Sequence, residues 1–287
     1  MTWRDKVLAL TSRAIVKQVL RLPLPWSVHR QAFRLVAPPL PVRGATFGMK
    51  DIAGVPCGMV TPTVVEGTLL WLHGGGFVLG SARSYVGLAA ALARQSGYRV
   101  ILPNYRLAPK HPFPAAPDDC LAVARVVASE GPFALGGDSA GGCLATVILS
   151  DLLRDGTPPR RLILASPVVD LDPERAVPDM SGELLFPLSI LYRVARDYTR
   201  HADPKDPRVS PIYANVTGAP PTLIQCARGE LLEGDTDALA ARLRDGGADV
   251  TVQKTSGVPH VWQIFVDRTP KADRAVRRMA DFLRGEA

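Results

Sequence analysis

A Gly-x-Ser-x-Gly pentapeptide occupies residues 137–141, with Ser139 at its centre. Residues 133–135 before it are apolar in the manner of a strand, and the apolar run 143–149 after it is typical of a helix. A serine on such a sharp strand-to-helix turn projects its hydroxyl from the end of a sheet, and small neighbours avoid clashes in the strained backbone. The start of the helix also favours negative charge that develops beside the serine. The pattern predicts a nucleophilic serine; the alternative is an ordinary glycine-rich connection.

A second glycine-rich segment, His73 followed by three glycines, comes directly after the apolar run 68–72. Three consecutive glycines let a loop turn back and present bare N–H groups, which are the donors that a developing oxyanion needs. Phe77 follows these glycines and is therefore a candidate for the wall of a substrate pocket. The rival interpretation is a phosphate-binding loop, but the spacing matches neither GxGxxG nor GxxxxGK followed by Ser or Thr. The loop therefore indicates acyl chemistry rather than nucleotide binding.

Together these two motifs resemble the bacterial hormone-sensitive-lipase-like esterases, also called family IV, of the α/β-hydrolase fold superfamily. That family carries an HGGG segment upstream of a GDSAGG segment, which residues 73–76 and 137–142 match. The resemblance runs from about residue 45 to the C-terminus, and the first 40 residues match only in kind, as a helical cap. Three further stretches match the family almost letter for letter: 105–109, 112–116 and 118–119.

The resemblance implies a role for each matched position. Ser139 would be the nucleophile, and His73 would anchor the glycine loop without titrating during catalysis. Residues 104–109 and Asp118 would be structural and would support the floor of the site. The reaction of the family needs neither a metal nor an organic cofactor, so we expect none. The oxyanion hole would consist of three backbone N–H groups, those of Gly75, Gly76 and Ala140.

The general base must follow the serine, because this fold supplies its catalytic residues in the chain order Ser, Asp or Glu, His. Of the five histidines, only His201 and His260 follow Ser139. His201 lies in the expected cap, whereas His260 lies between the last expected strand and the last helix, at the carboxyl edge of the sheet. The family places its base in a similar short Gly-x-x-His segment. His260 is therefore the predicted base.

Two carboxylates compete for the role of the acid. Glu230 and Asp235 both follow the expected strand 221–226. Many family members have an Asp in an Asp-Pro-Leu segment, and aligning the leucine places Glu230 at that position. Asp235 precedes a helical stretch and makes a good N-cap. Glu230 is the predicted acid, because Glu is an accepted variant of the triad acid, and Asp235 is the alternative.

Short β-branched runs alternate with helical stretches along most of the chain. This alternation predicts an α/β fold, with a mostly parallel eight-stranded sheet flanked by helices and a helical cap. The first two strands follow one another without a helix, which predicts an antiparallel start. The expected strands are 46–52, 57–61, 68–72, 98–103, 132–136, 160–165, 221–226 and 249–254. The expected helices are 1–21, 27–36, 84–96, 117–129, 139–154, 183–201, 235–245 and 270–284.

Helical stretches outside this alternation predict a cap over one end of the sheet. We expect residues 1–40 to be an N-terminal helical cap segment and residues 41–287 to be an α/β-hydrolase catalytic domain. Residues 175–210 would be a cap insertion within that domain. Aromatic residues of the N-terminal segment would either line an acyl pocket or bury a cap helix on the body: Trp3, Trp26 and Phe33.

Composition excludes several classes of protein. The 287 residues are 47% hydrophobic and include four cysteines without a CxxC pair, which excludes a disordered chain, a disulfide scaffold and a zinc site of ordinary spacing. The net charge is +7, but the basic residues are scattered, so we expect no nucleic-acid partner. The first residues lack the apolar core of a signal peptide, and no long uncharged apolar run occurs. We therefore expect a cytoplasmic protein without a membrane partner.

The combined expectation is a serine carboxylesterase that hydrolyses short- to medium-chain esters through an acyl-enzyme. The same triad would open a lactone ring, so a lactone hydrolase is a close alternative. A third interpretation is a non-catalytic small-molecule receptor on the same fold, but such relatives lose the base, whereas His260 is present. The expected partner is thus a small ester substrate. The expected edge strand 249–254 would also allow a homodimer.

Overall fold

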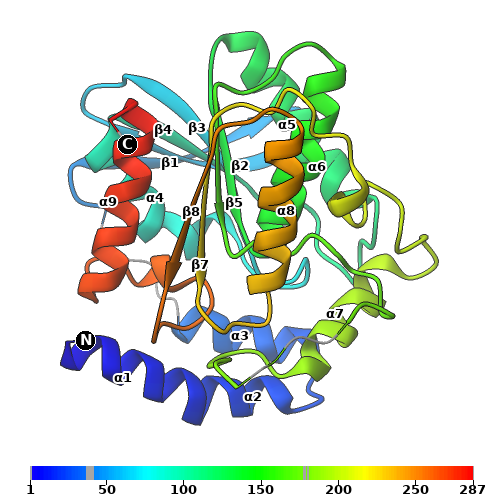
Figure 1. The fold of residues 1–287 in the computed structure, drawn as a ribbon. Helices are drawn as coiled ribbons and strands as arrows, with labels where there is room; N and C mark the ends of the chain where they lie inside the picture. Colours follow the sequence, from blue (N-terminus) through cyan, green and yellow to red (C-terminus); the bar gives the residue numbers. More distant parts are fainter. Residues whose placement is uncertain (1, 37–41, 177–178, 180, 287) are drawn as a thin grey trace.

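The computed structural model describes residues 2–36, 42–176, 179 and 181–286, which fold around an eight-stranded sheet (Figure 1). The strands lie in the order β1-β2-β4-β3-β5-β6-β7-β8. β2 pairs antiparallel with β1 and with β4, and the remaining pairs of described strands are parallel, which confirms the expected antiparallel start. The strands are β1 (Ala45–Ile52), β2 (Val55–Pro62), β3 (Gly67–Leu72), β4 (Tyr98–Pro103), β5 (Ala134–Asp138), β6 (Arg161–Ala165), β7 (Thr222–Ala227) and β8 (Val250–Thr255).

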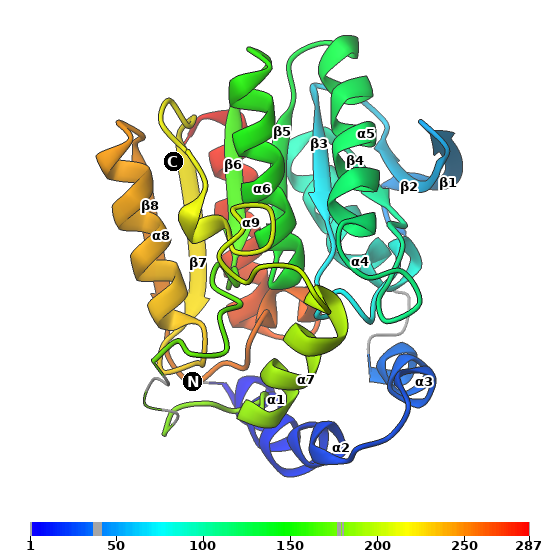
Figure 2. The same cartoon turned by 90° about the vertical axis from the view of Figure 1, so that its right-hand side faces the viewer.

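Helices cover both faces of the sheet (Figure 2). α4 (Ala82–Ser96) and α9 (Pro270–Arg284) pack on one face. α5 (Ala115–Glu130), α6 (Ala140–Arg154) and α8 (Glu233–Asp245) pack on the other. Because helices cover both faces, the central strands are mostly apolar rather than alternating, and all six residues of β7 are buried.

Most element boundaries differ from the sequence-based expectation by a few residues, and two of the differences bear on the site. β5 continues to Asp138, which pairs with Ala165 of β6 and whose carboxylate is held by Trp71 and Tyr85, so the strand leads directly to Ser139. The expected helix 183–201 is shorter, since α7 spans Leu188–Thr199. The Glu183 carboxylate accepts hydrogen bonds from the backbone N–H groups that follow it and holds this stretch in a turn.

Four helices gather beyond the carboxyl ends of the strands, and we call them the cap helices (Figures 1 and 2). The expected helix 1–21 is divided by a π-helical turn, Ser12–Val16, into α1 and α2. The N-terminal helices join α7 through Trp26, whose indole N–H donates to Asp197 Oδ2 at 2.7 Å and whose ring lies 4.0 Å from the Arg193 guanidinium. The cap helices are α1 (Trp3–Thr11), α2 (Lys17–Arg21), α3 (Trp26–Val36) and α7 (Leu188–Thr199).

β8 lies at the edge of the sheet, where the expected edge strand was placed. It pairs with β7 in parallel over its full length, from Val250 to Thr255. Within the described ranges, no helix combines the length and the apolar character needed to cross a bilayer.

Candidate active site

Ser139 lies at the junction of β5 and α6 with backbone angles φ +53° and ψ −120°. A non-glycine residue with positive φ stores strain and persists only where its surroundings fix it. Here the Ser139 N–H donates to the Ala165 carbonyl at 2.9 Å, and the flanking glycines leave no room for a side chain. A Cβ on Gly141 would lie 1.9 Å from the Leu72 carbonyl oxygen, and one on Gly137 would lie 2.3 Å from the Gly141 carbonyl oxygen. The pentapeptide is therefore the sharp turn that the sequence predicts.

The glycine loop turns back on itself directly after β3. Gly75 has φ +117° and Gly76 has φ +60°, in the region that glycine enters without strain. A Cβ on Gly75 would meet the Leu79 carbonyl oxygen at 2.5 Å. Gly75, Gly76 and Ala140 line the same cavity as Ser139, which is where the predicted oxyanion donors must be.

His73 is buried beneath this loop, and its contacts are with the loop and with Tyr105 rather than with Ser139. Its Nδ1–H donates to the Gly74 carbonyl at 2.8 Å, and its ring stacks on Tyr105 with centroids 4.2 Å apart. Burial disfavours the imidazolium and lowers the pKa of His73 to about 4, so the ring is neutral at neutral pH. This geometry agrees with an anchor that does not titrate.

Asp138 joins the glycine loop to the serine turn, a connection that the sequence analysis missed. Its carboxylate accepts hydrogen bonds from Trp71 Nε1 at 3.0 Å and from the Tyr85 hydroxyl at 2.6 Å. The Tyr85 oxygen in turn accepts from the Gly74 N–H at 3.1 Å. Burial raises the pKa of Asp138 to about 6, although these hydrogen bonds oppose the shift. The sequence did offer a signal for this role, because Asp138 is the one acidic residue in a pentapeptide of otherwise small side chains.

His260 and Glu230, predicted as base and acid, are in direct contact. His260 Nδ1 lies 2.8 Å from Glu230 Oε2, and both side chains are buried. Glu230 Oε1 accepts a further hydrogen bond from the Ala227 N–H at 3.2 Å, at the end of β7. His260 Nε2 has no hydrogen-bond partner among the described residues, so this nitrogen remains free to accept a proton.

The electrostatics of His260 favour its charged form. Burial disfavours the imidazolium, but the Glu230 carboxylate outweighs it, with smaller contributions from Glu183 and Asp138, so the pKa of His260 is raised. The Phe186 ring lies across the imidazole with centroids 4.6 Å apart. The site therefore stabilises a positive charge on His260 while keeping water away from its Glu230 side.

Asp235, the alternative acid, has a different partner, and its interpretation as an N-cap is wrong. α8 begins at Glu233, because the chain turns from Glu230 to Glu233 through a backbone hydrogen bond, and Asp235 lies inside the first helical turn. Its buried carboxylate binds the Arg175 guanidinium and accepts from the Val169 N–H at 2.8 Å. Asp235 thus anchors the segment after β6 and makes no hydrogen bond to His260.

The supporting role expected of Asp118 belongs to its neighbour. Asp118 pairs with Arg208 at 2.5 Å on the surface, and its side chain is half exposed. Asp119 is buried and binds both the backbone N–H of Arg106, at 2.9 Å, and its guanidinium. The loop of residues 104–109 is therefore held by Asp119, one residue further along α5.

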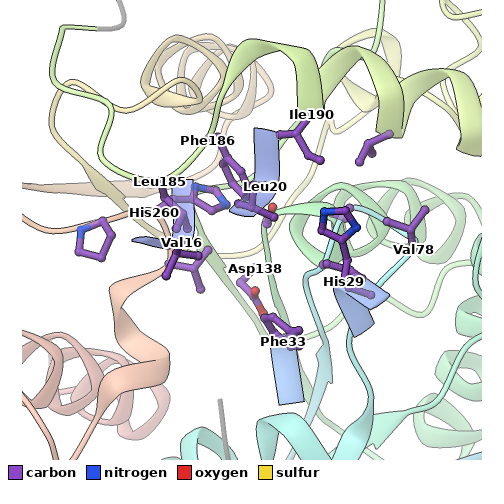
Figure 3. A pocket seen from close by; sticks show the side chains of 18 of the residues that line it. Val16, Leu20, His29, Phe33, Val78, Asp138, Leu185, Phe186, Ile190 and His260 are labelled. Carbon is purple, nitrogen blue, oxygen red and sulfur yellow. The ribbon is translucent and has the colours of Figure 1, made fainter. Parts of the chain in front are cut away.

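Ser139 and His260 line a cavity of about 230 Å³ between the sheet and the cap helices (Figure 3). Its wall is mostly apolar, with N-terminal residues on one side and residues around α7 on the other. Phe77 lies on this wall, stacked on Tyr198 with centroids 3.7 Å apart. Trp26 and Phe33 also line the cavity, whereas Trp3 is 70% exposed and neither lines it nor packs on the body. The labelled wall residues are Val16, Leu20, His29, Phe33, Val78, Leu185, Phe186 and Ile190.

Glu183 was not singled out from the sequence, because it lies in an irregular stretch without a motif. Its Oε2 accepts from the Leu231 N–H at 2.7 Å, next to Glu230, and its carbonyl accepts from Lys17 Nζ at 2.7 Å. Beside it the backbone passes so close that a Cβ on Gly182 would lie 2.8 Å from the Gly229 Cα. The segment before α7 is thus packed against the loop that carries Glu230.

In the part of the chain that the structure describes, no group of three or more His, Cys, Asp and Glu side chains is placed to hold a metal ion. The four cysteines are buried and unpaired. Burial raises the pKa of the Cys57 thiol to about 12. Cys143, one turn into α6, donates to the Val209 carbonyl within the core and is not placed as a second nucleophile.

Comparison with known proteins places these features in context. Residues 69–264 match a family described by the α/β hydrolase fold. An acetyl-hydrolase of Streptomyces hygroscopicus is 37% identical over 233 residues, 78% of each chain, and an esterase of Mycobacterium tuberculosis is 30% identical over 279 residues, 91% of this chain and 93% of its own. The solved structure of an esterase from the bacterial hormone-sensitive lipase family superposes with a TM-score of 0.89 at 28% identity, covering 100% of this chain and 99% of the other.

Proposed function

The chain belongs to the bacterial hormone-sensitive-lipase-like family of α/β hydrolases and is a carboxylic ester hydrolase; on this premise we propose that Ser139, His260 and Glu230 form its catalytic triad. The observation that carries the proposal is the hydrogen bond of 2.8 Å between His260 Nδ1 and Glu230 Oε2. It leaves Nε2 of the same ring free, in the cavity that Ser139 also lines. A receptor that only binds its ligand would need neither group.

In the first half of the reaction, Ser139 Oγ attacks the ester carbonyl while His260 Nε2 takes its proton. Glu230 holds the imidazole in position and stabilises the imidazolium that forms. The oxyanion of the tetrahedral intermediate accepts hydrogen bonds from the backbone N–H groups of Gly75, Gly76 and Ala140. His260 then returns the proton to the leaving alcohol as the carbon–oxygen bond breaks.

In the second half, His260 takes a proton from water, whose oxygen attacks the acyl carbon bound to Ser139. The same N–H groups hold the second oxyanion, and its collapse releases the carboxylic acid as the proton returns to Ser139 Oγ. The chain of hydrogen bonds through Asp138 and Tyr85 keeps the glycine loop in register with Ser139 throughout, because it ends on the Gly74 N–H.

The size of the cavity supports a preference for short- to medium-chain acyl groups. At about 230 Å³ it is smaller than the roughly 300–1,000 Å³ of pockets that hold drug-sized ligands. The acetyl-hydrolase among the relatives acts, by its name, on a short acyl group, in agreement with this preference. Phe77 would form part of the acyl-binding wall.

We also divide the chain by role. Residues 41–287 would form the catalytic domain, and residues 1–40 together with the insertion 175–210 would form a cap over the pocket; the boundary at residues 40 and 41 and residues 177, 178 and 180 lie outside the described residues. The support for this division is the wall of the cavity, which combines N-terminal residues with residues around α7.

The experiment is hydrolysis of p-nitrophenyl esters across a series of acyl lengths, with the parent protein and single variants. Ser139→Ala, His260→Ala and Glu230→Gln should each lower kcat by about a hundredfold or more without unfolding the protein. Glu174→Gln is the control, because it makes the same change at an exposed carboxylate that does not line the cavity. Lactones are assayed in parallel. If the parent hydrolyses a lactone faster than every ester, the preferred substrate is a lactone and the triad is unchanged.

Two outcomes would contradict the proposal. If Glu230→Gln retains activity while Asp235→Asn loses it at equal folded fraction, the acid is misassigned. If the folded parent hydrolyses no ester or lactone, the catalytic assignment fails altogether.

A further inference from the structure

The outer surface of the N-terminal helices carries an uncovered stripe of large apolar side chains. Of the eleven exposed large hydrophobic residues in the described chain, five fall within residues 3–22. Trp3 is 70% exposed, Leu10 is 66% exposed and Ile15 is 59% exposed. We call the five the apolar stripe: Trp3, Val7, Leu10, Ile15 and Leu22.

The π-helical turn keeps this stripe on one side of the helix. Trp3, Val7 and Leu10 follow the spacing of one helical face, but Ile15 is five residues after Leu10. At about 100° per residue, an uninterrupted α-helix would rotate Ile15 by about 140° away from Leu10. The wider turn at Ser12–Val16 takes in an extra residue and reduces this rotation. Ile15 is consequently exposed, although it also lines the cavity.

Positive charge accompanies the stripe. Arg4, Lys6, Arg13 and Arg21 are exposed, and in the described structure none of the four makes an ion pair. The one acid of the segment, Asp5, is buried and bound to backbone N–H groups. The outer face therefore combines apolar side chains with cations and exposes no carboxylate.

We propose that this face docks on an anionic lipid surface, with the apolar stripe entering the boundary between headgroups and acyl chains. A helix that lies in the plane of a membrane has this composition: a strip of aromatic and aliphatic side chains flanked by Lys and Arg. The cations would bind the headgroups of anionic lipids, each contributing about 1 kcal/mol. A second copy of the chain is a poorer partner, because pairing the stripes would bring their cations together on molecules of net charge +7.

The proposal departs from the expectation of no membrane partner, which rested on the lack of a spanning segment. An interfacial helix needs no such segment, since only one side of it leaves water. The stripe also borders the cavity: Ile15 is exposed and lines it, and Val16 and Val19 line it from the same turns. Docking would bring the cavity close to the lipid surface, and the binding itself does not depend on catalysis.

The test is co-sedimentation of the full chain with vesicles of phosphatidylcholine alone and of phosphatidylcholine and phosphatidylglycerol in equal parts. We expect binding to the anionic vesicles that falls with salt. The double variants Trp3→Ser/Leu10→Ser and Lys6→Glu/Arg21→Glu should each weaken it at least about tenfold. Val64→Ser/Val65→Ser and Arg43→Glu/Lys50→Glu are matched controls, because they change exposed residues elsewhere by the same chemistry.

Tryptophan fluorescence gives an independent readout. Trp3 is exposed, whereas Trp26, Trp71 and Trp262 are buried, so a blue shift on adding anionic vesicles reports Trp3 leaving water. Equal binding of the stripe variants and their controls, or no binding of the parent, would overturn the proposal. So would light scattering that shows an oligomer which Trp3→Ser/Leu10→Ser converts to a monomer, because the stripe would then be an interface between copies.

Discussion

Glu183 Oε2 accepts a hydrogen bond from the backbone N–H of Leu231 at 2.7 Å, so a carboxylate from the segment before α7 holds the loop that carries Glu230. Its other oxygen is occupied by the N–H groups of Leu185 and Phe186. Phe186 in turn lies against the His260 ring. The loop that carries the acid and the ring of the base are thus both in contact with one short stretch of the chain.

Replacing Glu183 by Gln should therefore lower kcat by about ten- to a hundredfold with a smaller effect on KM, because it disturbs the positions of Glu230 and His260. It also removes one of the negative charges that raise the pKa of His260. The neutral base would then persist to lower pH, and the acid limb of the kcat/KM profile should shift to lower pH. Glu174→Gln, exposed in the same stretch, is the control. A fall in kcat without a shift of the profile would reduce Glu183 to a packing role.

The pH profile of the parent protein makes a second test. His260 must be neutral to accept the proton of Ser139, and its pKa is raised because Glu230 outweighs the effect of burial. The activity kcat/KM should consequently fall on the acid side with an inflection above 6.5, the ordinary value for histidine. In residual-activity measurements on Glu230→Gln, the inflection should move to lower pH. An inflection below 6.5 in the parent would contradict the charge balance described for the site.

Removing the Tyr85 hydroxyl should lower the free energy of unfolding by an amount that depends on pH. Tyr85→Phe leaves the buried Asp138 carboxylate and the Gly74 N–H without their partner, at a cost of about 1–3 kcal/mol. The hydroxyl lowers the pKa of Asp138, which burial holds at about 6, so the cost should be larger above pH 6, where the carboxylate is charged, and smaller below it. Urea unfolding at several pH values measures this, with the exposed Tyr213→Phe as control. A cost independent of pH would show that Asp138 does not titrate in this range.

Two glycine-to-alanine changes should have opposite effects on the stability of the protein. Gly141→Ala places a Cβ 1.9 Å from the Leu72 carbonyl oxygen, and we expect a loss of about 3 kcal/mol or more together with loss of activity. Gly234→Ala, in the first turn of α8, meets nothing within 4 Å and should stabilise the protein by about 0.5–1 kcal/mol. Thermal unfolding measures both effects: the melting temperature should be lower than that of the parent for Gly141→Ala and higher for Gly234→Ala. If Gly141→Ala melts at the same temperature as the parent, the turn at Ser139 can relax to accept the added methyl group.

The sheet and the chemical motifs were accessible from the sequence because each depends on local pattern. Apolar runs marked the strands, chain order left His201 and His260 as candidates for the base, and the place of His260 between the last strand and the last helix selected it. The aligned leucine selected Glu230. The N-cap assigned to Asp235 was wrong because α8 starts two residues earlier, and the partner of Asp235, Arg175, is 60 residues away in sequence.

Features that depend on distant contacts gave no local signal. The hydrogen bond from Leu231 to Glu183 spans 48 residues, and that from Tyr85 to Asp138 spans 53. The π-helical turn likewise sits in a stretch whose apolar residues look helical throughout. For both hydrogen bonds, the partner is brought close only by the folded chain.

The N-terminal wall of the cavity has a consequence for how the protein can change over evolutionary time. Residues such as Val16, Leu20 and Phe33 line the cavity, while the hydrogen bond between His260 and Glu230 and the turn at Ser139 are built by other elements. Substitutions in this wall can alter which molecules fit without disturbing those groups. Selection for a new substrate would therefore act first on the N-terminal helices, and laboratory evolution should start its libraries there.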